Sequence, residues 1–556
     1  MKFDFFNLSL RYFNTLKHLK FIQFLGLIKK YYPKNKLITD KELRLSKPSI
    51  KWNLPLWRNS SQISERKFTF LNLEIDIKNF QCDTKTINKL WLYNLHYFDS
   101  INSQNKKIKS LDFYYIHNWI IEISNFKSPG WDPYPCSLRI VNWIKWILRG
   151  NNANLKMKRS LIRQTHWLYK NIEYHLLTNH IWANAKALCF AGLFFEGKAA
   201  DKWFKKGLKI IKKEIKEQCL NDGGHIERSP MYHSIFLEDL LEIIYLNNIY
   251  QNKFDQLFIN ELLIYSEKMI KWLIYLSHND GKISFFNDSA FDIACPVNKL
   301  IEIYQKISSK DMTGNLNIER SIHLKDSGFI RLQKNQLVCL CDVGSVGPDY
   351  MPGHAHAETL SFEISYKGER IFVNSGISTY EVSKTRDYQR STYAHNTLNI
   401  NGKNSSDVWS SFRVGSRAKL IKSHFSEDKK ELIFEGSHDG YKNLEGNPIH
   451  NRKWIIKDKE ISIIDYLQTS SNQNVFINYF IHPNFCLESK SDSLIFILNL
   501  ENDVIGKIII DKKFQAHIID TYWNYSFGKS LPNKLLSLNL KDFDSNITNV
   551  LKVIFI

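Results

Sequence analysis

Gly353-His354-Ala355-His356-Ala357-Glu358-Thr359-Leu360-Ser361-Phe362 leads directly into a clear β pattern. From Leu360 to Tyr366 the even-numbered residues are apolar and the odd-numbered residues are polar. This period of two is typical of a strand that buries one face. Short runs of the same kind follow, so residues 325–556 are predicted to form an antiparallel β-sandwich. The expected strands are residues 337–343, 360–366, 370–373, 395–400, 418–424, 431–435, 452–456, 460–466, 475–481, 493–498 and 506–510.

Two histidines and a carboxylate precede this strand at the same spacing. If the strand is continuous, His354, His356 and Glu358 lie on the face that carries the apolar side chains. Ionisable groups on a core-facing side cost roughly several kcal/mol unless they have partners. They therefore indicate a site that a metal, a substrate or other polar side chains complete. The alternative is a bend at Gly353 that resets the alternation and leaves the histidines on a loop.

The sequence before residue 310 has a helical pattern instead. Apolar residues recur with a helical period from about residue 85, and no strand pattern interrupts them. Helices in this number indicate paired helices arranged as a toroid or a stacked array. No repeat of fixed period is present, which argues against a tetratricopeptide-type solenoid. The expected helices are residues 118–126, 137–148, 160–174, 181–195, 199–218, 230–250 and 261–277.

These patterns predict an α+β multidomain protein. Residues 1–84 form an N-terminal arm and docking segment, residues 85–315 the helical domain, and residues 325–556 the β-sandwich. The boundary is expected in a polar stretch that contains Gly314. An all-α half followed by an all-β half leaves a cleft between them, where ligand sites concentrate.

Composition limits the classes of partner. The 556-residue chain is 43% hydrophobic and 14% aromatic, which supports large cores and argues against disorder. It carries 76 Lys and Arg against 56 Asp and Glu, a formal charge of +20 that attracts polyanions. Nucleic acid, an anionic membrane surface and an acidic polysaccharide all fit that charge. The sequence has no zinc-finger spacing, RNA-binding signature or Walker loop, so nucleic acid is not the expected partner.

The cysteines and the N-terminus bear on the compartment. Eight cysteines are scattered without a C-x-x-C pair, as is usual in a reduced compartment. The apolar run at residues 21–28 is a poor signal peptide, and no run is long enough for a membrane span. The expected location is therefore the cytoplasm or the cell envelope, with the periplasm as the alternative. The basic, aromatic arm is expected to be a docking helix, and contact with a membrane surface is the alternative.

The helical half contains a dense polar motif. Ser229 followed by Pro230 is a good helix start, which places Tyr232 in the first turn. The helix dipole favours a phenolate there, so Tyr232 could act as an acid or base. The alternative is a capped helix in which Tyr232 is only packed. Upstream, Asn179 and His180 precede an alanine-rich helix and supply amide and imidazole donors.

Together these segments resemble the heparinase II/III family of polysaccharide lyases. The resemblance covers roughly residues 85–490, and the joint order of its motifs makes it specific. It implies an incomplete (α/α) toroid followed by an antiparallel β-sandwich. The matching motifs are residues 90–99 (LWLYNLHYFD), 130–146 (GWDPYPCSLRIVNWIKW), 179–197 (NHIWANAKALCFAGLFFEG), 222–241, 353–362, 394–398 (AHNTL) and 405–417 (SSDVWSSFRVGSR).

The resemblance implies β-elimination at a uronic acid of an acidic polysaccharide, the expected partner. This reaction needs the C6 carboxylate neutralised, a base for the C5 proton and an acid for the departing C4 oxygen. By resemblance, Asn179 and His180 neutralise the carboxylate, Tyr232 is the principal base or acid, and His354 is its partner. The residues implied in substrate binding or orientation are Glu227, Arg228, Arg139 and Trp131.

The chemistry implied by the resemblance requires no cofactor, but some family members hold a structural zinc. The corresponding positions here are His356, His395 and Asn374, which stands where those members have an acidic residue. Asn is a poor zinc ligand, because the usual protein ligands are Cys, His, Asp and Glu. A structural zinc is therefore one expectation, and a hydrogen-bonded polar cluster of the three residues is the other.

Further departures leave alternatives open for the reaction. The chain looks similar to the family branch associated with making surface polysaccharides, in which the Asn at position 374 also recurs. A uronate C5-epimerase on the same scaffold is one alternative, since it shares the abstraction of the C5 proton. A non-catalytic protein for glycan binding or assembly is the other. The sequence leaves the sugar, its sulfation and the oligomeric state open.

Overall fold

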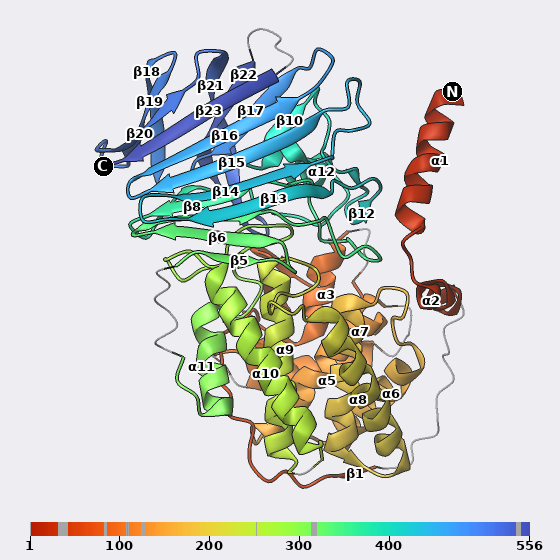
Figure 1. The fold of residues 1–556 in the computed structure, drawn as a ribbon. Coiled ribbons are helices and arrows are strands. Elements are labelled where there is room, and N and C mark those ends of the chain that lie inside the picture. The colour runs from red at the N-terminus through yellow and green to blue at the C-terminus, as the bar shows by residue number, and fades with distance from the viewer. Residues whose placement is uncertain are drawn as a thin grey trace.

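A computed structural model describes residues 2–31, 43–82, 86–106, 108, 110–123, 128–251, 253–312, 320–540 and 546–556. A helical part lies below a β part in Figure 1, and two N-terminal helices stand along one edge of the molecule. This arrangement confirms the predicted fold class.

The helical part is built from helices that pack mainly against their neighbours in the chain. Helix α5 packs on α6 and α7, α7 on α8, and α9 on α10 and α11. The predicted helical half is thus confirmed, although the end of the helix expected at residues 118–126 lies outside the described residues. The helices are α3 Lys89–Tyr97, α4 Ser110–Glu122, α5 Pro133–Leu148, α6 Leu155–Lys170, α7 Thr178–Phe194, α8 Lys198–Gln218, α9 Pro230–Ile249, α10 Gln256–Tyr275 and α11 Val297–Ser308.

Helix α7 lies at the centre of the helical part. Almost all of its side chains are buried, which its small residues allow. Its contact with α8 is close: a Cβ at Gly192 would lie 2.5 Å from the backbone nitrogen of Phe204, and one at Gly207 would lie 2.6 Å from the Ala185 carbonyl. Larger residues at either glycine would therefore push the two helices apart. Such packing fixes the start of α7, which carries Asn179 and His180.

Three antiparallel sheets form the β part. Their strand orders are β5-β6-β7-β8-β9, β13-β14-β15-β16-β23-β20-β19-β18 and β10-β17-β22-β21. Apolar side chains from the three sheets share one core. The strands are β5 Ile322–Leu324, β6 Phe329–Lys334, β7 Leu337–Asp342, β8 Phe362–Tyr366, β9 Glu369–Phe372, β10 Leu398–Ile400, β13 Leu420–Glu427, β14 Leu432–His438, β15 Ile449–Lys457, β16 Glu460–Gln468, β17 Val475–Phe480, β18 Phe485–Ser491, β19 Leu494–Asn499, β20 Val504–Ile510, β21 Phe514–Ser526, β22 Lys529–Leu540 and β23 Asn546–Phe555.

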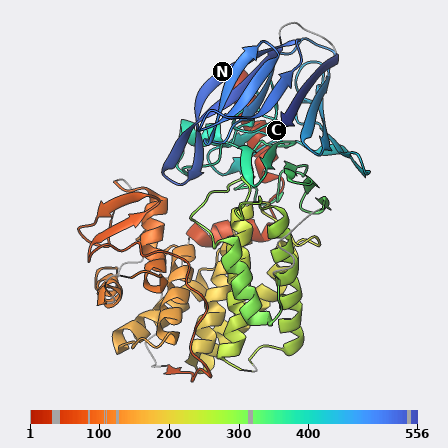
Figure 2. The same cartoon turned by 90° about the vertical axis from the view of Figure 1, so that its left-hand side faces the viewer.

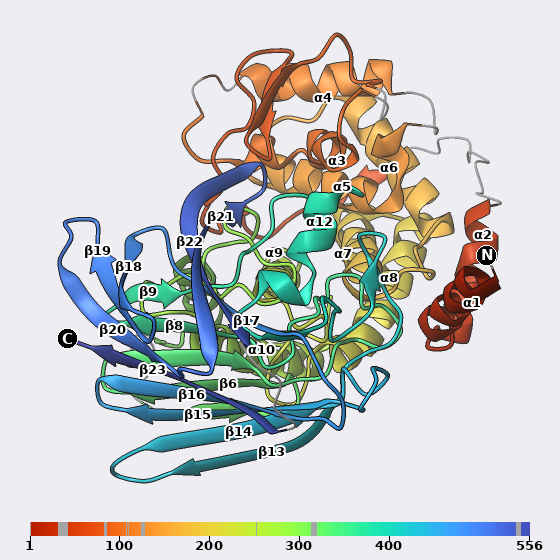
Figure 3. The ribbon, with the colours of Figure 1, turned by 90° about the horizontal axis from the view of Figure 1, so that it is seen from above.

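Each of the eleven expected strands has a counterpart, but several strands were not predicted. Among these are β5, β6, β18, β23 and the long hairpin of β21 and β22. This hairpin reaches toward the N-terminal hairpin of β2 (Lys67–Phe70) and β3 (Leu73–Asp76), as Figures 2 and 3 show. At the point of contact the Asn72 amide donates to the Phe527 carbonyl at 2.8 Å. The hairpins therefore tie the N-terminal arm to the β part.

The segment before β8 is a loop, which corrects the expectation of a continuous strand. Residues 353–361 have no strand structure, and Leu360 has a left-handed backbone with φ of 63°. The alternative of a loop that carries the histidines is therefore the one that the structure shows. Within β8, Phe362, Ile364 and Tyr366 lie in the core as the alternation predicted, but Glu363 and Ser365 are also buried, so both faces of the strand are covered.

The chain passes from the helical part to the β part between α11 and β5. Residues 313–319, which include Gly314 of the predicted boundary, lie outside the described residues. A second connection is made by residues 284–291, a loop between α10 and α11 that reaches into the β part. Its Asp288 amide donates to the His354 carbonyl at 3.0 Å, and its Phe291 amide donates to the Tyr525 carbonyl at 2.8 Å. We call residues 284–291 the linking loop.

Buried neutral histidines in the helical part should make the protein sensitive to acid. Burial lowers the pKa of His96 and of His233 to about 3. Between their ordinary pKa near 6.5 and that value only the unfolded chain takes up the proton. The stabilisation is therefore complete above about pH 6.5, and each histidine loses about 1.4 kcal/mol for each pH unit below it.

Urea unfolding between about pH 7 and pH 4 tests this expectation. The His96→Gln variant should show a shallower fall in the free energy of unfolding with pH than the wild type. The control is His424→Gln, which replaces an exposed histidine of β13 and should leave the slope unchanged. Equal slopes for His96→Gln and the wild type would contradict the assignment of a buried neutral imidazole.

Candidate functional site

Half-buried polar side chains from the helical and β parts meet at the interface of the two. The helical part contributes Tyr134 from α5, His180 from α7 and Tyr232 from α9, and the β part contributes His354 and Tyr380. The rings of Tyr134 and His180 pack on each other, and Tyr232 contacts both His354 and Tyr380 across the interface. These residues lie between the two halves, where the sequence predicted a ligand site.

Tyr232 and His354 form the central contact of the site. Their rings stack with centroids 3.7 Å apart and planes inclined by 26°. Tyr232 lies in the first turn of α9, where the Ser229 hydroxyl accepts a hydrogen bond from the Tyr232 amide at 3.1 Å. The predicted helix start is thus confirmed. The Tyr232 hydroxyl lies 3.2 Å from the Tyr380 hydroxyl, which places a third polar group at the same point.

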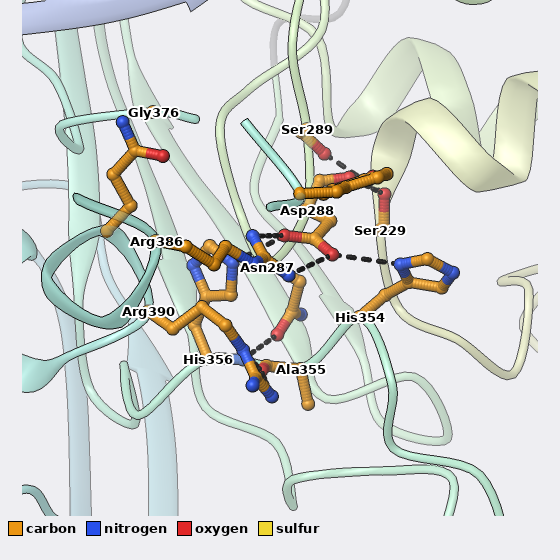
Figure 4. Close-up of polar contacts among 12 residues, drawn as sticks. Ser229, Asn287, Asp288, Ser289, His354, Ala355, His356, Gly376, Arg386 and Arg390 are labelled. Carbon is orange, nitrogen blue, oxygen red and sulfur yellow. Dashed lines mark hydrogen bonds and ion pairs between the residues drawn. The ribbon is translucent and has the colours of Figure 1, made fainter. Parts of the chain in front are cut away.

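The Asp288 carboxylate anchors His354, as Figure 4 shows. One carboxylate oxygen accepts from His354 Nδ1 at 2.8 Å, and the other accepts from His356 Nε2 at 2.8 Å. The Arg386 guanidinium donates to both oxygens, with its Nη2 2.7 Å from Oδ2. Asp288, His356 and Arg386 are buried. Opposite charge and hydrogen bonds hold the pKa of Asp288 well below its usual range, although burial alone would raise it.

The linking loop places Asp288 by contacts to both parts. The Ser229 hydroxyl donates to the Asp288 carbonyl at 2.6 Å. The side-chain amide of Asn287 donates to the Arg228 carbonyl at 2.9 Å, and its oxygen accepts from the His356 amide at 3.0 Å. Asn287 and Arg228 both have left-handed backbones, with φ of 55° and 56°. Strained backbone of this kind persists where surrounding contacts hold it, as at preorganised sites.

The protonation of the central pair follows from these contacts. Burial, with smaller contributions from Tyr380 and Asp288, raises the pKa of Tyr232 well above its usual range. Tyr232 is therefore a neutral phenol with a proton to give. Because Asp288 is ionised, it accepts the hydrogen bond from His354 Nδ1, and in the neutral ring this tautomer has its lone pair on Nε2. A proton donor and a proton acceptor thus lie side by side.

Asn179 and His180 occupy the first turn of α7. This end of the helix has unpaired backbone N–H groups and a partial positive charge, which favour a carboxylate. The Asn179 side-chain oxygen is buried without a hydrogen-bond partner. His180 Nδ1 lies 3.2 Å from Glu173, and its ring packs on Tyr134 with centroids 4.6 Å apart. Two consecutive left-handed residues, Leu177 and Thr178, lead into this turn.

Glu227 and Arg228 have different surroundings. Glu227 is buried, its Oε2 has no hydrogen-bond partner, and its charge helps to raise the pKa of Tyr134 and Tyr380. It therefore lies at the edge of the site. The Arg228 guanidinium donates to the carbonyls of Ser345 and Asp326 in the β part. The structure gives Arg228 contacts that link the two parts, and its role in substrate binding stays a prediction.

The structure contradicts the substrate-binding roles predicted for Arg139 and Trp131. The exposed fraction is 0% for Arg139 and 2% for Trp131, so neither side chain is open to a ligand. Arg139 donates to Gln164 at 2.8 Å and to the Gly130 carbonyl at 2.8 Å. Trp131 donates from its indole nitrogen to the Ile123 carbonyl at 3.2 Å. The aromatic and basic side chains of their motif, residues 130–146, mainly stabilise the core of the helical part. Tyr134 is the residue of this motif that reaches the site.

The predicted metal cluster has a different third member. His356 Nδ1 lies 3.1 Å from His395 Nε2, as the sequence predicted for a polar cluster. Asn374 does not join them, because its amide donates to the Phe285 carbonyl at 3.0 Å and its oxygen accepts from the Asn396 amide at 3.1 Å. The third group is Glu358, whose Oε2 lies 3.2 Å from His395 Nε2.

The donor set of His356, Glu358 and His395 suits a cation. All three residues are buried, and their candidate ligand atoms lie within 4.8 Å of one another. His395 Nδ1 donates to the Ser391 carbonyl at 2.7 Å, which leaves a lone pair on Nε2. His356 Nε2 donates to Asp288, which leaves a lone pair on Nδ1. Lone pairs therefore face one another here, and two histidines with a carboxylate fit zinc.

Several residues of the site were missed in the sequence. Asp288 was missed because it lies in a loop of the helical part, 66 positions before His354. Its only signal is the polar run Asn287-Asp288-Ser289 among phenylalanines. Arg386 lies on the short helix α12 (Lys384–Gln389), where basic residues are unremarkable. Tyr134 and Tyr380 could not be distinguished from the many other aromatic residues of this chain.

Comparison with protein families gives two matches in chain order. The family described as "Heparinase II/III N-terminus" matches residues 152–311, and the family described as "Heparinase II/III-like, C-terminal" matches residues 318–539. The first covers the helical part from α6 to α11, and the second covers most of the β part. Both parts of the site therefore fall within matched regions, apart from Tyr134.

Curated relatives and solved structures agree with these families. A heparin-sulfate lyase from Bacteroides stercoris is 25% identical over 57% of this chain and 48% of its own length. One from Pedobacter heparinus is 26% identical over 42% of this chain and 38% of its own length. The match thus spans about half, or less, of the length of these relatives. A crystal structure of heparinase III matches with a TM-score of 0.71 and 16% identity, over 96% of this chain and 89% of that one.

Proposed function

Because the chain belongs to the heparinase II/III family, we propose that it is a polysaccharide lyase that cleaves a uronic-acid-containing glycan by β-elimination. The observation that carries this proposal is the stacked pair of Tyr232 and His354, a neutral phenol beside an imidazole whose Nδ1 is held by Asp288. Elimination needs one group that takes a proton from C5 and one that gives a proton to the C4 oxygen. The pair supplies both groups at one point of the cleft.

In the first step the C6 carboxylate of the sugar is held at the start of α7. The backbone N–H groups of the helix end and the Asn179 amide donate to it. Neutralising the carboxylate stabilises the negative charge that develops when C5 loses its proton. Asn179 would act through its side-chain NH₂ group, since the amide oxygen can only accept a hydrogen bond.

In the second step His354 Nε2 removes the C5 proton, and Tyr232 gives its phenolic proton to the departing C4 oxygen. The C5–H electron pair forms the 4,5 double bond, and the C4–O bond breaks. Asp288 holds the Nδ1–H of His354, which orients the ring and its tautomer, and it stabilises the imidazolium afterwards, as a carboxylate does behind a catalytic histidine. Proton exchange with solvent or between the two groups restores the resting state.

Replacing Asn179 should affect binding and chemistry together. We expect Asn179→Ala to lower kcat/KM about 10²–10³-fold, the usual effect of losing one donor to a developing charge. Asn179→Asp should be lower still, since a second carboxylate repels the uronate. The rate of ultraviolet absorbance gain from the unsaturated product measures both variants. Asn151→Ala, which changes an exposed Asn, is the control, and full activity of Asn179→Ala would contradict the role.

The substrate is proposed from the chemistry of the site and the net charge. A formal charge of +20 attracts a polyanionic chain and raises its rate of encounter with the cleft. Heparan sulfate, chondroitin, hyaluronan, alginate and the polysaccharides of the producing cell form a panel that tests the uronate requirement. A role in surface polysaccharide metabolism stays a prediction, which activity on the cell's own polysaccharide would support.

We also propose a structural zinc ion held by His356, Glu358 and His395. The ion would compensate the lone pairs that converge there and fix the loop that carries His354, and the elimination needs no step through it. Metal analysis of the purified protein should find about one zinc per chain, and His395→Gln should lose it. The control is His438→Gln, which breaks a buried contact with His450 at 3.1 Å elsewhere in the β part. Zinc retained by His395→Gln, or absent from the wild type, would contradict the proposal.

A further inference from the structure

Helix α2 (Phe21–Tyr31) turns its polar and small residues toward the protein. Gln23 and Gly26 are the buried residues of this helix. The Gln23 amide donates to the Tyr350 carbonyl at 3.1 Å and to the His175 carbonyl at 3.3 Å. A Cβ at Gly26 would lie 2.5 Å from the backbone nitrogen of His175, so the helix touches the protein at this point. These contacts fix which face of α2 is turned outward.

The outward faces of α2 are apolar. The exposed fraction is 76% for Phe21, 61% for Ile28 and 80% for Tyr31. Phe24 and Leu25 are also exposed. A surface helix of a globular protein normally buries its apolar residues and exposes its polar ones. Helix α2 has the opposite arrangement, which the folding of this chain alone does not explain.

Helix α1 (Lys2–Leu16) extends the apolar surface across a short turn. Its Phe13 and Leu16 are exposed, while Arg11 pairs with Asp407 and Thr15 bonds to Trp409 in the β part. Figures 1 and 3 both show α1 and α2 at the edge of the molecule. We call the exposed set the N-terminal apolar surface. It consists of Phe13, Leu16, Phe21, Phe24, Leu25, Ile28 and Tyr31.

The charge around this surface selects its partner. Residues 2–31 contain six Lys and Arg and one acidic residue, Asp4. Lys17, Lys29 and Lys30 are exposed beside the apolar side chains. Anionic lipid headgroups attract such lysines, and the apolar residues enter the boundary between headgroups and acyl chains. A second copy of this chain would instead bring the same positive charges face to face.

The dimensions favour a helix that lies on a membrane over one that crosses it. Helix α2 has 11 residues and α1 has 15, whereas a membrane span needs about 20. Among the described residues no helix is both long and apolar enough to cross a bilayer. We propose that the N-terminal apolar surface docks the protein on an anionic membrane, with α2 in the lipid interface. This inference is independent of the proposed lyase activity.

Vesicle flotation tests the proposal with purified full-length protein. Wild type should float with vesicles of phosphatidylcholine and phosphatidylglycerol, and high salt or pure phosphatidylcholine should weaken binding. Phe21→Ser/Ile28→Ser should bind at least about tenfold more weakly, because two exposed apolar anchors are lost. The control, Leu257→Ser/Ile264→Ser, changes two exposed apolar residues of α10 and should bind as the wild type does. Lys29→Glu/Lys30→Glu should lose the preference for anionic lipid.

Three results would overturn the proposal. One is a wild type that does not float with anionic vesicles at low salt. Another is equal weakening by the α2 and α10 variants, which would indicate non-specific adsorption. The third is a wild type that is a dimer in light scattering and does not bind vesicles, together with a Phe21→Ser/Ile28→Ser variant that is a monomer. That result would assign the surface to a second copy of the chain. Melting temperatures show that each variant is folded, and both serine substitutions are at exposed positions.

Discussion

Tyr232→Phe is expected to lower kcat for uronate elimination by about 10²–10⁴-fold, the usual contribution of a general acid or base. The substitution removes the phenolic proton and keeps the ring that stacks on His354. Among the described residues the Tyr232 hydroxyl has one hydrogen-bond partner, the Tyr380 hydroxyl, so its removal costs the fold little stability. Initial rates of ultraviolet absorbance gain on an active polymer measure the effect.

The matched control for this variant is Tyr380→Phe. It removes the partner of the Tyr232 hydroxyl but not the proposed proton donor, so its kcat should fall less than about tenfold. Substrate binding by both variants should stay close to that of the wild type. If Tyr232→Phe kept activity within about threefold of the wild type, Tyr232 would have no acid or base role.

Asp288→Asn is expected to reduce both activity and stability. The amide no longer fixes the proton on His354 Nδ1, so kcat should fall by about 10⁴-fold, as with the carboxylate behind other catalytic histidines. The change also leaves the buried Arg386 guanidinium without its counter-charge. Breaking a buried pair in this way costs about 3–5 kcal/mol in the free energy of unfolding. Initial rates and urea unfolding measure the two effects separately.

A second carboxylate–guanidinium pair supplies the control. Asp280 accepts from Arg370 at 2.8 Å, but it is more exposed and does not contact the catalytic pair. Asp280→Asn should therefore cost less stability and leave kcat nearly unchanged. If both variants lowered kcat equally, Asp288 would act only through the general stability of the fold. Equal activity of Asp288→Asn and wild type would remove Asp288 from the mechanism.

The parts of the fold that were predictable depend on local sequence. Ser229 and Pro230 start α9 as expected, because capping and proline geometry act over a few residues. The period of two identified β8, since Phe362 and Ile364 face the core. The burial of the other, polar face of β8, which carries Glu363, was not predictable from this pattern. His278 of the helical part covers it and bonds to Glu363 at 2.9 Å.

The parts of the site that were not predictable depend on long-range contacts. Asn179, Tyr232 and His354 came from motifs, and the structure brings Tyr232 and His354 together. Asp288 acquires its role only when the linking loop reaches the β part, which no local pattern records. Likewise the loop before β8 bends at Leu360 and turns Glu358 toward His395. The alternation of residues along a strand predicted that Glu358 faces the core. It could not show that Glu358, and not Asn374, is the third member of the cluster with His356 and His395.

The β21–β22 hairpin and the N-terminal arm show a further limit. The hairpin strands run for 13 and 12 residues, and their sequence alternates only in part, because much of the hairpin extends beyond the core. The arm was expected to be a docking helix. It does contact the protein through Gln23 and Gly26, but its apolar residues face outward. Apolar residues alone could not reveal the direction, because the buried contacts use a polar and a small residue.

The central claim is elimination at a uronic acid, and product analysis in deuterated water tests it most directly. Wild-type protein is incubated with the polysaccharide panel, and chain length and C5 deuterium are measured by mass spectrometry and NMR. We predict shorter chains that end in a 4,5-unsaturated uronate, formed by the wild type and not by Tyr232→Phe. Chains of unchanged length that carry deuterium at C5 would contradict elimination and indicate an epimerase. Chains that bind but stay unchanged would contradict any catalytic role for the pair of Tyr232 and His354.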